Sequence, residues 1–500
     1  MVVGHHPAPN EEPLSTPTAN TLEHARHLDL SGKHEDALAA FREHLRIHPD
    51  STEGWVDCAE LLLMLHRPLE AQEACEAALR LQPQHYGATT YLALARMNQG
   101  ELGESEALFK QAIHLEPQRL SARLMLSDCL VRKGDPDQAL ALIDGVLEQD
   151  PGHAIATDKR STIMALRGDW QGLRKSMERQ LTRYSGMEAI YVASHLDLMF
   201  GDMSRGWRQF ESRLEIPNRP QPKHTLNKPR WNGEPFQGKT LLLTWEQGLG
   251  DTLMFLRFAP MAKALGGTVV VEVQPPLAEL AATCHGIDQV LLPGQPIPPF
   301  DLHASLLSLP ALFNIDLASI PADTPYLHVP EHVPDRQAIS SLLGQSADSI
   351  RIGLCWTGSG QYARDTKRSI PASVLAPLGS LPGATWYGFQ FEHPEDVPLP
   401  GMVPLGPLLK GFPNTAYALS LMDLVISVDT VTAHLAGALG IPTLLLLSFI
   451  PDWRWMLGRN DTPWYPTTRL YRQTTPGDWD SVIRHVVADL TAGPSPEPGA

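Results

Sequence analysis

The sequence predicts a chain of two parts, a helical solenoid built from repeats followed by an α/β region with parallel sheets. Three observations lead to this prediction. In the first half prolines recur at intervals of 34 residues, a Pro-rich basic stretch follows at 216–230, and beyond it short apolar runs alternate with helical patterns. A period of this length is typical of repeat architectures, whereas alternation of strands and helices is typical of parallel sheets.

Three kinds of residue keep the repeat in one phase. The prolines are Pro49, Pro83, Pro117 and Pro151. The glycines, each 17 residues before such a proline or before the next expected one, are Gly32, Gly100, Gly134 and Gly168, with His66 in the missing place. Small residues five positions later are Ala37, Ala71, Ser105 and Ala139. We expect each glycine to separate paired helices, each small residue to let them approach, and each proline to open a new hairpin.

This spacing resembles the tetratricopeptide repeat, and four units from about Thr18 to Gly152 match it. A fifth unit is weaker. A sixth, containing Trp207 and Phe210, is slipped by one residue, which suits a capping unit that faces a different neighbour. Such arrays bind a partner in their groove or dock a neighbouring domain, so no catalysis is expected from them. The expected boundaries are a disordered tail at 1–17, repeats at 18–215 and a linker at 216–230.

The α/β region is expected to form two Rossmann-like domains, at 231–345 and 346–491, with a disordered tail at 492–500. The strands expected are Thr240–Trp245, Thr268–Val273, Ile287–Leu292, Ile350–Trp356, Thr385–Phe389, Leu424–Val428 and Pro442–Leu447. The helices expected are Asp251–Leu265, Thr430–Leu439 and a closing helix at Asp478–Leu490.

Composition excludes several classes of protein. Lys and Arg number 40 against 56 Asp and Glu, giving a net charge of −16, so binding to duplex nucleic acid is not expected. The longest apolar run, Ile441–Ile450, is too short to span a bilayer. No signal peptide is visible, and the five cysteines show no CxxC spacing. A cytoplasmic protein without a transmembrane segment is therefore expected.

Two loops at expected strand ends could form a site, because ligands bind at the carboxyl ends of parallel strands. The first is Glu246-Gln-Gly-Leu-Gly-Asp251, in which Gly248 and Gly250 allow close approach of the backbone. Asp251 there is either a helix cap or a functional group. The second loop carries Asp429 and Thr430, with His434 one turn further along the helix that follows.

A basic cluster follows the first strand of the second domain. It comprises Thr357 and then Arg364-Asp-Thr-Lys-Arg-Ser369, and its charge suits a diphosphate, although a solvated loop is the alternative. The aromatic segment Asp452-Trp-Arg-Trp455 either walls the site or only packs. Asp478-Trp-Asp480 has the form of a metal-binding pair but follows no strand, so no metal is expected.

The second half resembles glycosyltransferase family 9, the heptosyltransferase-like enzymes with the two-domain GT-B architecture. The resemblance covers about Pro229 to Leu490, and its most specific pieces are Gly248-Leu-Gly-Asp251 and Asp429-Thr430 with His434. Repeats followed by such a domain are similar in outline to the O-linked N-acetylglucosamine transferases. Glu246-Gln247 and the segment Phe300–Pro310 depart from the heptosyltransferase pattern, so the sugar and the acceptor stay unspecified.

The resemblance implies a role for each candidate residue. Asp251 would be the general base, and no cofactor beyond a nucleotide-diphosphate sugar as co-substrate would be needed. The residues implied in donor binding are Gly248, Gly250, Thr357, Lys367, Arg368, Asp429, Thr430 and His434. A protein or peptide acceptor held by the repeats is the expected partner. Two alternatives stay open: a catalytically degenerate fold that serves as an interaction module, and an isomerase or epimerase acting on a nucleotide sugar.

Overall fold

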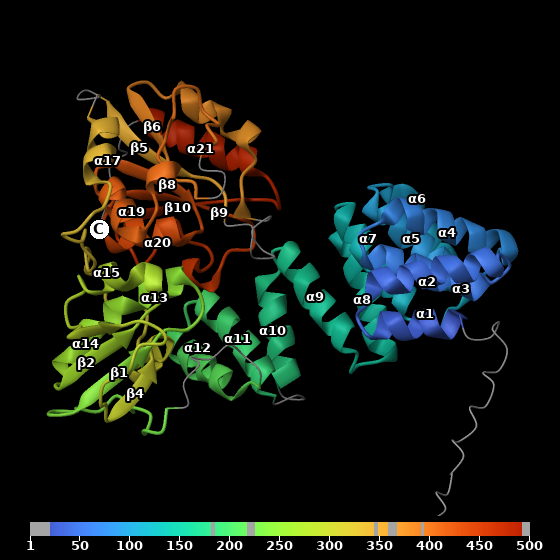
Figure 1. Cartoon of the computed structure of the whole chain (residues 1–500), viewed down its shortest axis with the longest axis horizontal. Helices are drawn as coiled ribbons and strands as arrows, with labels where there is room; N and C mark the ends of the chain where they lie inside the picture. Colours follow the sequence, from blue (N-terminus) through green and yellow to red (C-terminus); the bar gives the residue numbers. More distant parts are fainter. Residues whose placement is uncertain are drawn as a thin grey trace, which may run out of the picture. The chain divides into compact units, whose positions relative to one another are not determined.

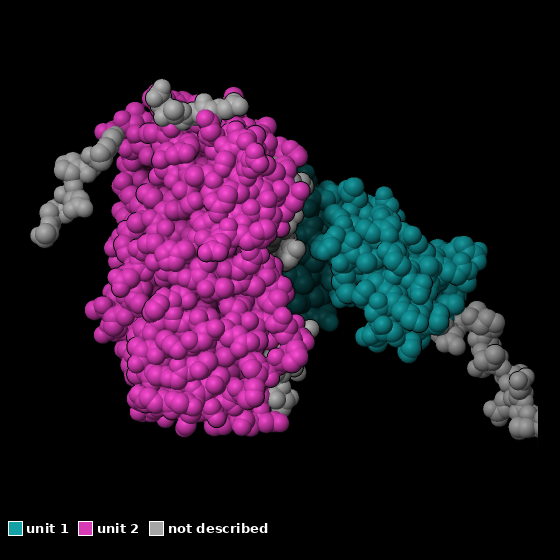
Figure 2. Space-filling model, turned by 60° about the vertical axis from the view of Figure 1, so that its left-hand side comes forward, with its two compact units in different colours: residues 1–173 teal, residues 174–500 magenta. Residues whose placement is uncertain are grey.

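The structure is a computed structural model and describes residues 21–181, 186–217, 226–344, 349–358, 368–391 and 395–492. The expected tail at 1–17, most of the tail at 492–500, residues 218–225 of the expected linker, and Lys367 lie outside these ranges. The chain forms two compact units, residues 1–173 and 174–500 (Figure 2).

The first unit is a series of antiparallel helical hairpins. Its helices are α1 (Thr21–Leu30), α2 (His34–Ile47), α3 (Thr52–Met64), α4 (Pro68–Leu81), α5 (Tyr86–Asn98), α6 (Leu102–Leu115), α7 (Ser121–Arg132), α8 (Pro136–Gln149) and α9 (Ala154–Leu166). Up to α9, each helix packs on the next one in the chain. Helix α10 (Trp170–Leu181) crosses the boundary between the units.

The phase of the repeat is confirmed. Gly32, Gly100 and Gly134 each lie between the helices of one hairpin with a positive φ of 74°, 88° and 83°. His66 takes the same left-handed conformation, with a φ of 58°. The four prolines lie between successive hairpins. The small residues are fully buried where the helices cross, as expected for a close approach: Ala37, Ala71, Ser105 and Ala139.

The second unit begins with a short helical segment. It contains α11 (Met187–Met199), α12 (Met203–Phe210) and the 3₁₀ helix η1 (Glu211–Glu215). The slipped sixth repeat therefore packs with the α/β region that follows it. Trp207 of α12 and Phe210 are each only 1% exposed, so this segment shares the hydrophobic core of the second unit.

The α/β region contains two wholly parallel sheets. The first has the order β3-β2-β1-β4 and the second β10-β9-β8-β5-β6-β7. Figure 1 labels β1, β2 and β4 of the first sheet and most strands of the second. The strands of the first sheet are β1 (Thr240–Thr244), β2 (Thr268–Glu272), β3 (Gln289–Leu291) and β4 (Leu302–Ser305). Those of the second are β5 (Ile350–Cys355), β6 (Ala384–Gly388), β7 (Val403–Pro404), β8 (Leu424–Val428), β9 (Thr443–Leu447) and β10 (Thr468–Arg472).

In both sheets the chain first adds strands on one side of the sheet's first strand and then moves to its other side. This change of side lies between β1 and β4 in the first sheet and between β5 and β8 in the second. Connections on either side of such a point run to opposite faces, which leaves a crevice at the carboxyl ends of the two strands. The topology thus marks two places where a ligand would bind.

The helices that matter for the site follow these strands. They are α13 (Leu249–Phe255), η2 (Leu256–Phe258), α14 (Ala259–Ala264), α16 (Leu309–Leu312), α20 (Val431–Ala438), η7 (Trp453–Trp455) and the closing helix α21 (Trp479–Ala492). The prediction of one helix over Asp251–Leu265 was wrong, because the helix starts at Leu249 and is broken at η2. Pro260 lacks the N–H that a continuous helix would need there.

Three strands were not predicted. Strand β4 alternates Leu302 and Ala304 with His303 and Ser305, so it lacks the apolar run by which the other strands of its sheet were found. Edge strand β10 places Arg469 and Arg472 among its apolar residues, and β7 has only two residues. Edge strands tolerate such charged and short sequences because one side has no neighbour to pair with.

The left-handed glycines give a test of the hairpin geometry. No heavy atom lies within 4 Å of a Cβ added at Gly134 or at Gly145, but only Gly134 has a positive φ. Gly134→Ala should therefore lower the free energy of unfolding by roughly 1–2 kcal/mol. Gly145→Ala, within α8, should raise it by up to about 1 kcal/mol. Denaturant unfolding measures both, and equal effects of the two changes would contradict the hairpin assignment.

Candidate functional site

The loop after β1 is held at both of its ends. Glu246 is 8% exposed and pairs with the Arg213 guanidinium, with Nε–Oε2 and Nη2–Oε1 distances of 2.9 and 3.0 Å. At the other end the Asp251 carboxylate accepts a hydrogen bond from the Gly248 N–H at 2.9 Å through Oδ2. The N-cap residue of α13 is Gly248 and not Asp251, which lies at the third helical position and closes a capping box with Gly248. The other Asp251 oxygen, Oδ1, makes a separate contact.

That contact is an ion pair with Arg454, which lies in the loop after β9 of the second sheet. The same guanidinium also binds Asp452, with an Nη1–Oδ1 distance of 2.6 Å. The side chains of Arg454 and Asp251 are only 10% and 14% exposed. One buried cation therefore joins the carboxyl edges of the two sheets through a carboxylate from each.

The second sheet adds the groups expected at its switch point. Asp429 and Thr430 follow β8, and Thr430 is the N-cap residue of α20. Arg368 donates from Nη1 to the Asp429 backbone carbonyl at 2.7 Å. Thr357 follows the neighbouring strand β5, where its N–H donates to Gln390 Oε1 at 3.3 Å. Strands β5 and β8 pair in parallel, so Thr357, Asp429 and Thr430 lie at one edge of the sheet, where Arg368 joins them through Asp429.

The charges of this cluster act on one another. Burial and the nearby Asp452 carboxylate raise the pKa of Asp429 to about 6. Burial also raises the pKa of Asp251, against the opposing effect of Arg454. For Asp452 burial acts in the same sense, but the Arg454 guanidinium outweighs it and lowers the pKa. Arg454 therefore favours the charged forms of all three acids.

His434 lies in the same cluster but is enclosed by protein. Its ring stacks on Trp455 with a centroid separation of 5.4 Å, and Nδ1 lies 2.9 Å from the Tyr465 hydroxyl. Burial and the Arg454 charge lower its pKa to about 3, so the ring is neutral near pH 7. A Cβ added at Gly250 would lie 2.8 Å from His434 Cδ2. The close approach that Gly250 permits is therefore between α13 and α20.

The structure brings most of the predicted residues together. Asp251, Arg368, Asp429, Thr430 and His434 share one cluster, with Gly248 and Gly250 in the loop that leads to it. Lys367 lies outside the described residues. The assignment of these residues to donor binding or catalysis stays a prediction. Among the described residues no group of three or more His, Cys, Asp and Glu is arranged to hold a metal ion.

Arg454 is not among the site residues that the sequence predicts. The aromatic rings dominate the segment Asp452–Trp455, although it also contains an acid and an arginine. A charged pair inside an aromatic run that follows a buried strand is a usable signal, because unpaired charges are rarely buried. Arg213 is not predicted as a site residue either, since it lies in the region expected to be repeats.

Chemically, the cluster offers a carboxylate, fixed cations and a helix N-terminus within one buried setting. The backbone N–H groups at the start of α20 and the Arg368 guanidinium favour an anion near Asp429. The Asp251 carboxylate, whose pKa is raised by burial, is a candidate to accept a proton. This combination suits a reaction in which one group loses a proton while another leaves with negative charge.

Comparison with known proteins identifies the repeats at residues 56–157. Residues 56–118 and 96–157 match family descriptions of the tetratricopeptide repeat. The chain contains tetratricopeptide repeats. In this protein they coincide with helices α3 to α9, where the prolines and left-handed residues keep the 34-residue phase.

The whole chain has a more distant relative. It is 25% identical over 488 residues to Protein FlbA of Caulobacter vibrioides, covering 91% of this chain and 75% of that protein. Solved repeat proteins are also similar. MamA of Desulfovibrio magneticus RS-1 has 21% identity and a TM-score of 0.26, covering 27% of this chain and 76% of that chain. A tetratricopeptide repeat protein from Parabacteroides merdae has 13% identity and a TM-score of 0.34, covering 40% and 80%.

Within the described residues no helix is both long and apolar enough to cross a membrane.

Asp429→Asn tests the electrostatics of the cluster. The folded state keeps the Asp429 proton up to a pH of about 6, against a reference value of 3.8, so its ionisation destabilises the fold as the pH rises between these values. The free energy of unfolding of the variant, minus that of the wild type, should therefore be larger at pH 7.5 than at pH 4. Urea unfolding at the two pH values measures the difference.

The matched control is Asp461→Asn. The hydrogen bond from Arg459 lowers the pKa of Asp461, so this change should lower stability at pH 7.5 relative to pH 4. A pH-independent effect of Asp429→Asn would contradict the charge arrangement described for the cluster.

Proposed function

We propose that the α/β region is a GT-B glycosyltransferase resembling family 9, which moves a sugar from a nucleotide-diphosphate donor to an acceptor hydroxyl. The main support is that the carboxyl ends of β1 in the first sheet and of β8 in the second lead to loops that share one cluster. Asp251 of the first sheet and Asp429 of the second approach the same buried Arg454. A transfer reaction needs a base for the acceptor and an anion site for the donor at one place, and this arrangement provides for both.

In the proposed reaction Asp251 accepts the proton of the acceptor hydroxyl. The acceptor oxygen then forms a bond to the anomeric carbon, and the bond from that carbon to the diphosphate oxygen breaks. The nucleoside diphosphate leaves with the electron pair. Arg368 and the N-terminal amides of α20 would stabilise the charge on it.

The contacts of Asp251 are compatible with this role. Oδ2 accepts from Gly248 and Oδ1 faces Arg454, and each carboxylate oxygen has a further lone pair for an incoming hydroxyl. Arg454 would keep the carboxylate ionised while its burial raises the pKa. His434, being neutral and packed, would act by holding α20 against α13.

The tetratricopeptide repeats point to a protein partner, because arrays of this kind present a groove for peptide segments. We propose that this partner carries the acceptor hydroxyl. A second candidate is a degenerate enzyme that serves as an interaction module. The observation in its favour is that Asp251 already closes a capping box and pairs with Arg454, as a purely structural acid would.

A thermal-shift screen with nucleoside diphosphates and their sugars tests the donor side first. Transfer would be supported if one nucleotide sugar stabilises the protein and if its nucleoside diphosphate is then cleaved from the sugar when an acceptor is present. Tight binding of the nucleotide without any donor hydrolysis or transfer would favour the interaction module.

Asp251→Asn tests the base. The amide keeps an oxygen for the Gly248 N–H, so donor affinity should hardly change, while transfer should fall by about 10²–10⁴-fold. Asp452→Asn is the matched control, since it removes the other carboxylate on Arg454 but no proposed base.

Arg368→Ala should instead weaken donor binding through the lost charged contact. Calorimetric donor affinity and transfer rates separate the three, and near-normal transfer by Asp251→Asn would remove Asp251 from the mechanism.

A further inference from the structure

The helical segment Met187–Glu215 contacts the candidate site directly. Gln247 of the loop after β1 lies with Nε2 3.5 Å from the Tyr191 hydroxyl of α11. The Trp207 ring of α12 meets Phe255 of α13 at a centroid separation of 6.0 Å and Trp453 of η7 at 5.2 Å. This segment therefore packs on elements from both sheets, beside the two loops that carry Asp251 and Arg454.

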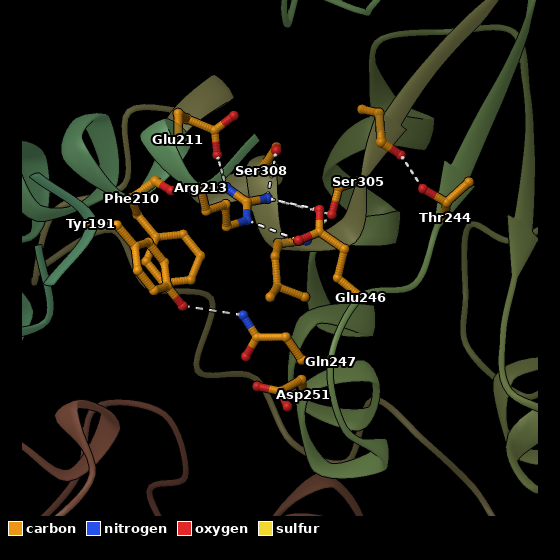
Figure 3. Close-up of polar contacts among 12 residues, drawn as sticks. Tyr191, Phe210, Glu211, Arg213, Thr244, Glu246, Gln247, Asp251, Ser305 and Ser308 are labelled. Carbon is orange, nitrogen blue, oxygen red and sulfur yellow. Dashed lines mark hydrogen bonds and ion pairs between the residues drawn. The ribbon is translucent and has the colours of Figure 1, made fainter. Parts of the chain in front are cut away.

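Arg213 makes the strongest of these contacts. It is 2% exposed, and Figure 3 shows its guanidinium between Glu246 and Glu211. Besides the two bonds to Glu246, Nη2 donates to Ser308 Oγ at 2.9 Å, and Nη1 donates to the Phe210 carbonyl at 3.2 Å. Ser308 ends the turn after β4, so one side chain ties the carboxyl ends of β1 and β4 to the helical segment.

The loop held in this way has an unusual backbone. Gln247, next to Glu246, has a φ of 63°, a left-handed conformation that costs free energy for any residue other than glycine. Such a conformation persists only where the surroundings enforce it. Glu246 is fixed by Arg213 on one side and Asp251 by Gly248 and Arg454 on the other, so the loop is constrained from both ends.

A buried ion pair of this kind is poor evidence for stability. Apolar residues of similar volume often replace such pairs without loss of stability, because desolvation offsets the attraction. What they cannot replace is the directional fork of two parallel bonds that fixes a carboxylate in one orientation. The value of the Arg213–Glu246 pair therefore lies in the geometry that it imposes on the loop.

We infer that Arg213 is a positioning residue which, acting through Glu246, holds Gln247 and Asp251 in their reactive arrangement. The segment Met187–Glu215 would then be part of the catalytic unit and not only the end of the repeats. The inference rests on the proposed function, in which Asp251 is the base. The shape of the loop can be measured without any assay of activity.

The double variant Arg213→Met/Glu246→Leu tests it in the full chain. The two buried charges are removed together, and the carboxylate that loses its partner, Glu211, is 30% exposed to water, so the unfolding midpoint should remain close to that of the wild type. Hydrogen exchange of the peptide covering 245–252 should become at least tenfold faster, because the loop loses one of its two anchors. Transfer should fall at least tenfold with little change in donor affinity, since the charged contacts proposed for the donor, Arg368 and the N-terminal amides of α20, lie outside this loop.

Arg213→Lys covers the case in which the double variant does not fold. Lysine keeps the charge but cannot form the fork, so exchange in 245–252 should rise while the fold is kept. Asp197→Leu is the matched control. It removes a buried acid of α11 that pairs with Arg174 and Arg205, so it should change stability without changing exchange in the loop.

Wild-type exchange and unchanged transfer in a folded Arg213 variant would overturn the inference and leave the proposed function intact. If the wild type transfers no sugar, the proposed function fails, and exchange alone still decides whether Arg213 shapes the loop.

Discussion

The arrangement of the α/β region depends on one buried cation. Arg454 takes a carboxylate from the first sheet, Asp251, and one from its own loop, Asp452. Removing one partner of such a buried group typically costs about 3–5 kcal/mol, because a charge is left without compensation. Burial and the Asp452 carboxylate raise the pKa of Asp429 against the effect of Arg454, whereas burial and the Arg454 charge together keep His434 neutral.

A second set of buried contacts supports the first. Arg257 of η2 donates to the Trp464 carbonyl of the second sheet's region, and its guanidinium lies 4.6 Å from the centroid of the Tyr465 ring. Tyr465 in turn contacts His434. The imidazole is thus buried between the Trp455 and Tyr465 rings, and this burial, with the charges of Arg454 and Arg257, keeps it neutral.

Much of the fold could be predicted because it depends on local sequence. The spacing of the prolines and glycines predicts where each hairpin begins and turns, since few residues other than glycine adopt a left-handed turn. Apolar runs predict the positions of most strands. Asp251 and Asp429 could be found because each follows a buried strand. The ion pairs of Arg454 with Asp251 and of Arg213 with Glu246 could not, since the partners lie 203 and 33 residues apart in the sequence. Nothing in a local pattern selects one carboxylate among many as the partner of a distant arginine.

The packing of Trp207 bears on how this chain can be divided. Its ring touches Phe255, Trp453 and Trp464, all of which are at most 3% exposed. A fragment that began after the Pro-rich stretch would uncover these aromatic side chains as one apolar surface, and exposed patches of that kind promote aggregation. The natural place to separate the repeats from the α/β region therefore lies before α11, within what the sequence alone presents as a continuous array.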